Sequence, residues 1–217
     1  MTTLADLGPL AQLRAGRLGR RLPQLLVGLV VYGISLALMV RGALGVAPWD
    51  VLHLGIAEHL GLSLGTVLVG TSFVVLILWI PLREKPGIGT VANALMIGPS
   101  TDATLAVLHQ PDALVWRLAL MLGGVALCVL ATAMYIGAQF GRGPRDGLMT
   151  GLVRRTGLSI RLVRTSLEVA VVLVGLLLGG PLGVGTVVFA LTIGPLTQWM
   201  LPAWTVSLQK SEEPVFA

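Results

Sequence analysis

One stretch of this chain is repeated later in the sequence, and the repeat limits the folds that are possible. Residues 45–102 align with residues 141–198 at a constant offset of 96 without a gap, and 21 of the 58 aligned positions are identical. Many identities are Gly, Pro and Asp, so shared hydrophobicity does not account for them. Weaker matches extend the repeat upstream, at Arg21/Arg117, Leu22/Leu118 and Gly28/Gly124. The chain is therefore expected to fold as two similar halves.

Long stretches of the sequence carry no charge. Residues 60–82 and 169–209 contain no Asp, Glu, Lys or Arg, and a membrane-spanning helix needs about 20 apolar residues. Only 12% of all residues are charged, whereas soluble domains have about 25%. These features predict a polytopic membrane protein surrounded by a lipid bilayer. The net charge of +5 is explained by basic cytoplasmic loops, and no nucleic-acid partner is expected.

Each half is expected to contain three spans and one short helix. The first repeat covers 21–108, with spans near 24–43, 64–82 and 88–108 and a short helix at 48–60. The second repeat covers 117–206, with spans near 117–140, 160–179 and 184–206 and a short helix at 144–156. The remaining segments, 1–20 and 207–217, are expected to be cytoplasmic tails.

The short helices begin with a Pro-x-Asp element. Pro48 and Pro144 suit the first turn of a helix, where Asp50 and Asp146 cap the positive end of the helix dipole. About 12 residues at a rise of 1.5 Å reach roughly 18 Å, too short for an apolar core of about 30 Å. Each short helix is therefore expected to lie at the membrane interface or to enter the membrane and return.

The basic residues predict which side of the membrane each loop faces. With the N-terminus inside, 13 of the 15 Lys and Arg residues fall in cytoplasmic segments or at their borders. Segment 45–63 has no Lys or Arg, whereas its counterpart 141–159 has four. An odd number of spans per half inverts the second half. We therefore predict an all-α membrane protein of six transmembrane helices in two inverted-topology three-helix repeats, with both termini cytoplasmic.

The repeated motifs also resemble a known family, the bacterial YczE/YyaS/YitT membrane proteins. The resemblance covers about residues 20–200 and rests on GVAPWDVL, GRGPRDGLM, the GLS, GIGT and GVGT motifs, and the IGP triplets. It implies a six-span integral protein of the bacterial plasma membrane. YitT-type members carry an additional soluble C-terminal domain, whereas only SLQKSEEPVFA follows the last expected span here, which resembles the short form. The resemblance implies no particular substrate.

No constellation typical of catalysis stands out in the sequence. The HExxH and CxxC motifs and a Walker lysine are absent. His53 and His59 are six residues apart, not the four that place two ligands of one metal on one helix face. We therefore predict no catalytic residues, no metal and no cofactor, with a lipid-modifying activity as a weaker alternative.

A candidate substrate path is marked by interruptions and polar residues in the expected spans. Gly-Pro pairs at matching positions of two halves point to a midplane site, although a kink tolerated for packing is an equal alternative. The GxGT turns either border the path or form tight capped turns. The path residues are Thr90, Asn93, Gly98, Pro99, Asp102, Thr186, Gly194, Pro195 and Gln198. Glu168, four residues after Arg164, is expected to form an intramembrane ion pair with it.

These features favour a small secondary transporter or permease with a path between the halves for a solute or ion. The alternative is an accessory or regulatory membrane protein that binds a partner through its basic cytoplasmic loop. That loop would contact anionic lipid headgroups or an acidic partner through Arg142, Arg145, Arg154, Arg155 and Arg161. Homo-oligomerisation is compatible with either function.

Overall fold

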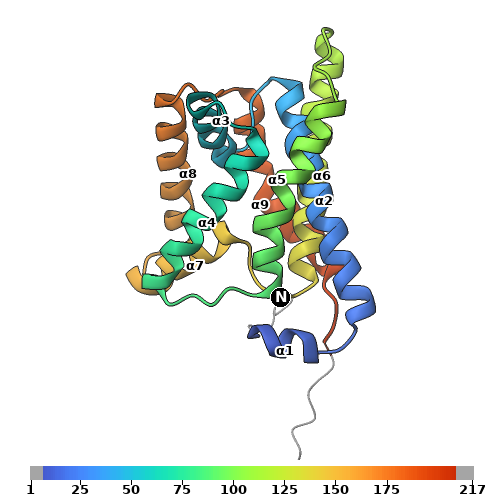
Figure 1. The fold of residues 1–217 in the computed structure, drawn as a ribbon, viewed down its shortest axis with the longest axis vertical. Coiled ribbons are helices and arrows are strands. Elements are labelled where there is room, and N and C mark those ends of the chain that lie inside the picture. The colour runs from blue at the N-terminus through green and yellow to red at the C-terminus, as the bar shows by residue number, and fades with distance from the viewer. Residues whose placement is uncertain (1–6, 209–217) are drawn as a thin grey trace, which may run out of the picture.

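The computed structural model describes residues 7–208, and every regular element in this range is a helix (Figure 1). The all-helical class expected from the sequence is confirmed. The helices are α1 (Pro9–Arg14), α2 (Leu18–Gly42), α3 (Pro48–Leu60), α4 (Leu64–Leu82), α5 (Ile88–Val107), α6 (Leu114–Gly137), α7 (Pro144–Thr156), α8 (Ile160–Leu177) and α9 (Val184–Trp204). Parts of the expected tails, residues 1–6 and 209–217, lie outside the described residues.

Four of the helices are long and apolar enough to cross a membrane: α2, α4, α6 and α9. The other two expected spans are more polar. Helix α5 contains Asn93 and Asp102, and α8 contains Arg161, Arg164 and Glu168. Length and composition therefore support four of the six expected spans.

Helices α2 and α6 pack on each other most extensively. Glycines allow the close approach, because a Cβ on Gly28 would lie 3.1 Å from the backbone nitrogen of Tyr135 and one on Gly124 would lie 2.9 Å from the carbonyl oxygen of Ser35. Around this pair, α5 packs on α2 and α9 packs on α6. The first helix of each half thus contacts both the equivalent helix and the last helix of its own half.

Helix α2 begins at Leu18, earlier than the expected span, and carries a buried arginine in its first turn. The Arg21 guanidinium donates to the carbonyl oxygens of Ala138 and Gln139, both at 2.9 Å. Its sequence equivalent Arg117 donates in the same way to Gly42 at 3.0 Å and Ala43 at 2.6 Å. Each arginine therefore satisfies carbonyls at the end of the other half's first helix, which have no partner inside that helix.

The short helices α3 and α7 lie at opposite ends of the molecule (Figure 1) and each packs on the other half: α3 on α8, and α7 on α4. The GxGT turns, residues 87–90 and 183–186, bind the segments that lead into α7 and α3 through backbone hydrogen bonds. The Gly89 N–H donates to Phe140 O and the equivalent Gly185 N–H donates to Leu44 O, both at 2.7 Å. A Cβ on Gly87 would lie 2.5 Å from Phe140 O, so these turns require glycine. Their observed role is to position α7 and α3.

Candidate functional site

A cavity of about 340 Å³ lies between the two halves. The N-terminal turns of α3 and α7 line it, together with faces of α2, α4, α5, α6, α8 and α9. Both short helices begin with proline, at Pro48 and Pro144, and both end at a left-handed glycine, Gly61 with φ 63° and Gly157 with φ 70°. These local signals fix where each short helix starts, and the start is the end that lines the cavity.

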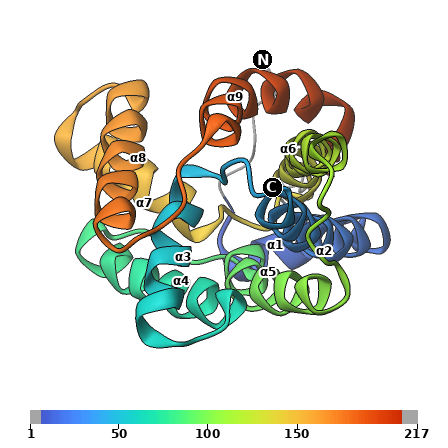
Figure 2. The same cartoon turned by 90° about the horizontal axis from the view of Figure 1, so that it is seen from above.

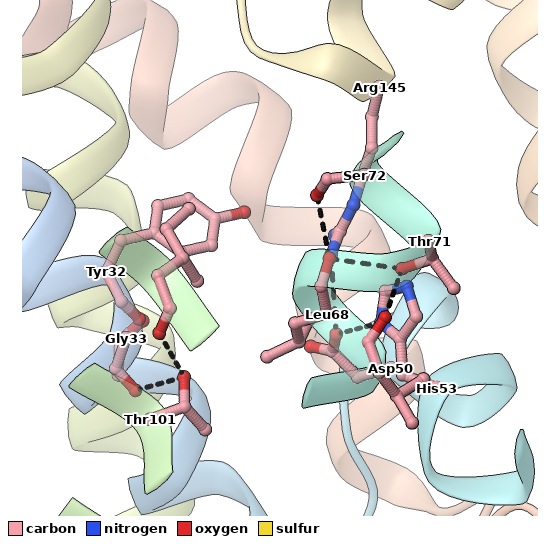
Figure 3. Close-up of polar contacts among 12 residues, drawn as sticks. Tyr32, Gly33, Asp50, His53, Leu68, Thr71, Ser72, Thr101 and Arg145 are labelled. Atoms are coloured by element: carbon pink, nitrogen blue, oxygen red, sulfur yellow. Dashed lines mark hydrogen bonds and ion pairs between the residues drawn. The ribbon is translucent and has the colours of Figure 1, made fainter. Parts of the chain in front are cut away.

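The two Pro-x-Asp elements meet beside this cavity. Arg145 Nη2 lies 3.6 Å from Asp50 Oδ1, and the guanidinium carbon lies 5.3 Å from the centre of the Trp49 ring. Asp50 also contacts His53 Nδ1 at 2.9 Å. Figure 3 shows Arg145 reaching Asp50, with Tyr32 on the facing helix and its hydroxyl directed into the space between them. Asp50 is buried, so this carboxylate depends on its polar neighbours.

His53 is buried behind Asp50. Burial lowers the pKa of His53 below its usual value, and the hydrogen bond to Asp50 opposes this effect without overcoming it. The imidazole is therefore neutral near neutral pH, and a neutral ring can donate one N–H to Asp50. The charge of Asp50 is then balanced by Arg145.

A second polar cluster surrounds Gly143, the residue that immediately precedes α7. The Tyr135 hydroxyl donates to Asp146 Oδ2 at 2.5 Å. A Cβ at Gly143 would lie 3.3 Å from Asn93 Nδ2, from Asp146 Oδ2 and from the Tyr135 hydroxyl. Asn93 is 9% exposed and lines the cavity, and its side-chain amide forms no hydrogen bond to any residue in the described range. Its amide is therefore available to a molecule in the cavity.

The remaining wall is formed by α8 and α9. Arg164 Nε donates to Glu168 Oε1 at 2.9 Å, which is the ion pair expected from their spacing. On α9, Gly194, Thr197 and Gln198 face the cavity, and the buried Thr197 Oγ1 has no partner among the described residues. This wall therefore presents both charged and unsatisfied polar groups.

Equivalent helix pairs in the two halves differ in how they pack. Helix α4 packs on α5, where Gly65 and Gly98 bring the two backbones into contact. Helix α8 barely touches α9, and Figure 2 shows them on separate sides of the molecule. A Cβ on Gly194, the equivalent of Gly98, would have no neighbour nearer than Arg164 Nη1 at 3.6 Å.

Residue differences at equivalent positions explain why α4 packs on α5 whereas α8 lies apart from α9. Asp102 holds the start of α4, because its Oδ1 accepts from the Gly65 N–H at 2.7 Å and its Oδ2 accepts from Ser63 Oγ at 2.6 Å. In the second half, Arg161 replaces Gly65 and Gln198 replaces Asp102. A long side chain thus stands where the first half has the glycine that permits contact, and the cavity extends between α8 and α9.

The structure brings together part of the expected substrate path. Asn93, Gly98, Gly194 and Gln198 line the cavity. Pro99 and Pro195 are exposed on the outer faces of their helices, and Asp102 binds the start of α4. Thr90 Oγ1 donates to Arg142 O at 2.6 Å, and Thr186 is buried at the equivalent turn. These five residues therefore do not line the cavity.

Sequence reasoning misses several cavity residues, among them Arg145, Tyr32, Tyr135 and Thr197. It places Arg145 at lipid headgroups and does not single out the other three. The chain has only two tyrosines, and both lie inside long apolar segments, where a hydroxyl needs a polar partner. That rarity was the signal that could have identified them. The capping prolines and aspartates, in contrast, were expected at the helix starts but not at a shared cavity.

Comparison with known proteins identifies relatives over most of the chain. The model of a family of unknown function, DUF6198, matches residues 19–202. An uncharacterized protein of Haemophilus influenzae is 42% identical over 177 residues, covering 82% of this chain and 81% of the relative. No solved structure matches significantly.

Two Bacillus subtilis proteins also match. One, described as the uncharacterized membrane protein YczE, is 30% identical over 178 residues, covering 81% of this chain and 82% of the relative. The other, described as the uncharacterized protein YyaS, is 26% identical over 180 residues, covering 81% and 90%. With the apolar helices, these matches indicate a membrane protein and confirm the resemblance that the repeated motifs suggested. The chain belongs to the DUF6198 family, among YczE-like and YyaS-like proteins.

Proposed function

We propose that this protein is a small secondary transporter or permease of the bacterial plasma membrane. The observation that carries the proposal is the polar cavity on which the N-terminal turns of α3 and α7 converge from opposite ends. Short helices that stop partway and present their positive ends to a central site are a recurring way to build transporter binding sites. Groups such as Asn93 and Thr197 are costly without a partner, so a site for a solute accounts for them.

The proposed membrane arrangement has six spans in two inverted repeats, with both termini in the cytoplasm. Three features support it: equivalent short helices lie at opposite ends, each packs on the other half, and the basic residues are concentrated in alternate loops. Helices α5 and α8 would complete the six spans. Asp102 and the Arg164–Glu168 pair have polar partners, which reduces the cost of placing them in a membrane, and Arg161 lies in the first turn of α8, at the proposed cytoplasmic end.

In this arrangement, α4–α5 and α8–α9 act as two gates. The Ser63–Asp102 contact would lie near the outside, at the start of α4 and the end of α5. Its equivalent, Ser159 and Gln198, would lie near the cytoplasm. With α4 against α5 and α8 apart from α9, the cavity would be open to the cytoplasm and closed to the outside. If α4 and α5 separated while α8 and α9 packed together, the cavity would be open to the outside instead.

Cysteine labelling of intact cells tests the inverted arrangement. Glu58 and Arg154 are sequence equivalents, both exposed near the ends of α3 and α7. A membrane-impermeant maleimide added outside is expected to label Glu58→Cys and not Arg154→Cys, and inside-out vesicles should give the reverse. Native Cys128 is fully buried and provides a silent background. Labelling of both positions from one side would refute the inversion.

Flux measurements test transport itself. Proteoliposomes that contain the wild-type protein are expected to accumulate a labelled solute in counterflow, and a Ser63→Cys/Asp102→Cys disulfide should abolish accumulation until it is reduced. Reduction is the matched control, because it uses the same preparation. If no solute of any charge class moves and both gates stay fixed, the accessory function is the better account.

We also propose that anionic headgroups contact the exposed arginines at the proposed cytoplasmic end. Arg142, Arg154, Arg155 and Arg161 are exposed, whereas Arg145 turns inward to Asp50. Juxtamembrane basic residues are each attracted to anionic leaflets by about 1 kcal/mol. Native mass spectrometry of the purified protein measures which lipids it retains. Arg155→Gln should retain less anionic lipid than the wild type.

A further inference from the structure

We infer that the central cavity binds a small zwitterion with an apolar body, whose carboxylate pairs with Arg145 and whose ammonium lies beside Asp146. The inference rests on the transporter function proposed above and names the class of solute. It is carried by two polar clusters of opposite charge that border the same cavity and are each incompletely satisfied.

The positive side of the site is the Arg145 guanidinium. It has five N–H donors, yet its acidic neighbour Asp50 is at 3.6 Å, beyond the usual N–H···O range of about 2.7–3.2 Å. The Arg145 side chain is 28% exposed and lines the cavity. A guanidinium accepts a carboxylate through two parallel hydrogen bonds. A carboxylate in the cavity would therefore satisfy donors that Asp50 leaves unused.

The negative side of the site is Asp146. It accepts from Tyr135 at 2.5 Å, and no basic side chain in residues 7–208 forms an ion pair with it. The Asn93 side chain, which is nine-tenths buried and has no hydrogen bond in that same range, lies at the same place beside Gly143. The Asp146 carboxylate and the Tyr135 oxygen are acceptors that suit the N–H donors of an ammonium group, and the Asn93 amide lies beside them.

The balance of charge disfavours a solute with one charge only. The charged side chains that line the cavity are Arg145, Arg164, Asp146 and Glu168, two positive and two negative. A simple anion would leave the Asp146 carboxylate without a counter-charge, and a simple cation would leave the Arg145 donors unsatisfied. A molecule that carries both charges matches both clusters.

The size and the remaining lining indicate what the rest of the solute is like. A volume of about 340 Å³ is near the lower end of ligand pockets, which hold roughly 300–1,000 Å³. Phe189, Ile193 and Leu201 on α9 form an apolar wall. A compact molecule with a short hydrocarbon body, such as an amino acid with an apolar side chain, fits this combination.

Matched probes separate the two charges. The test uses purified protein in nanodiscs and tritiated leucine, with two competitors of the same hydrocarbon shape. 4-Methylpentanoate keeps the carboxylate and lacks the ammonium, whereas 3-methylbutylamine keeps the ammonium and lacks the carboxylate. Unlabelled leucine is expected to compete at least about tenfold better than either, because each charged contact contributes at least that factor.

Substitutions of Arg145 and Asp146 test which residue binds the carboxylate of the solute and which binds its ammonium group. Arg145→Gln and Asp146→Asn are each expected to weaken leucine binding at least about tenfold. Arg145→Gln should favour 3-methylbutylamine over 4-methylpentanoate in a thermal-shift assay, and Asp146→Asn should reverse that order. Arg155→Gln, on the exposed end of the same helix, and Asp112→Asn, in an exposed loop, are matched controls that should bind leucine as the wild type does. Arg145→Lys keeps the charge and should retain part of the binding.

Two results would overturn the inference. One is a singly charged analogue that competes as well as leucine. The other is the absence of binding by leucine, valine and phenylalanine at millimolar concentration to wild-type protein that is monodisperse. Either result leaves the transporter proposal standing if the two gates still exchange, since gate crosslinking reports exchange independently of the solute.

Discussion

Asp102 fixes the start of α4 to α5 by accepting a hydrogen bond from the backbone N–H of Gly65 at 2.7 Å. At the equivalent place in the second half, the side chains of Gln198 and Arg161 form no hydrogen bond within the described residues, and α8 lies apart from α9. Two segments of similar sequence therefore adopt two different packings in one molecule. That difference is the basis of the gating proposed here.

Alanine substitutions at the equivalent glycines Gly98 and Gly194 should have opposite effects on stability. A methyl group at Gly98 meets the carbonyl of Gly65, so Gly98→Ala is expected to cost about 1–3 kcal/mol through overpacking. The methyl group of Gly194→Ala meets only Arg164 Nη1, at an ordinary contact distance of 3.6 Å, so this variant should be neutral or stabilised by up to about 1 kcal/mol, because alanine favours helix. Thermal unfolding of both variants in detergent measures the difference. Equal destabilisation would contradict the two packings.

A methyl group at Gly143 should obstruct the cavity without disturbing the fold. The backbone there has φ −64° and ψ 159°, which alanine adopts readily, and the equivalent position in the first half is already Ala47. Gly143→Ala would crowd Asn93, Asp146 and Tyr135, each 3.3 Å from the new carbon. Leucine binding is expected to fall at least about tenfold while the stability changes by less than about 1 kcal/mol. Unchanged binding would place the solute elsewhere.

The stability of the protein should decrease in mild acid because of His53. The unfolded chain takes up a proton at this histidine near its ordinary pKa of about 6.5, whereas burial lowers the pKa in the folded protein. The unfolded state therefore binds more protons below this pH, and stability falls as pH drops towards the lowered pKa. The measurement is the thermal midpoint between pH 7.5 and pH 5. His53→Gln should flatten this part of the profile; an unchanged slope would mean that another group is responsible.

The repeat made much of the helix arrangement predictable from the sequence. Prolines and glycines mark the bounds of α3 and α7, and Pro48–Leu60 and Pro144–Thr156 coincide with the expected ranges. The start of α2 was less predictable, because Arg21 is a charged residue that becomes buried only when the carbonyls of Ala138 and Gln139, more than a hundred residues away, accept its hydrogen bonds.

The cavity was harder to predict than the helices. A Gly-Pro pair suggests a site near both residues, but each proline faces outward while only the glycines Gly98 and Gly194 face inward. Arg145 belongs to a basic segment, and no local pattern distinguishes it from exposed arginines such as Arg155. Its role follows from the approach of the N-terminal turns of α3 and α7 to each other, which is a tertiary contact without a signal in either motif.

The most direct test of the central claim is disulfide crosslinking across the two gates. Ser63→Cys/Asp102→Cys reports the α4–α5 gate and Ser159→Cys/Gln198→Cys reports the equivalent α8–α9 gate, in native membranes with a mild oxidant. We expect that the two gates do not crosslink in the same molecule. When the α4–α5 gate is crosslinked, Thr197→Cys should react only with reagent added from the cytoplasmic side. When the α8–α9 gate is crosslinked, Thr197→Cys should not react from that side. If the second pair never crosslinks, or if both pairs crosslink in the same molecule, the two halves do not exchange their packings and the account is wrong.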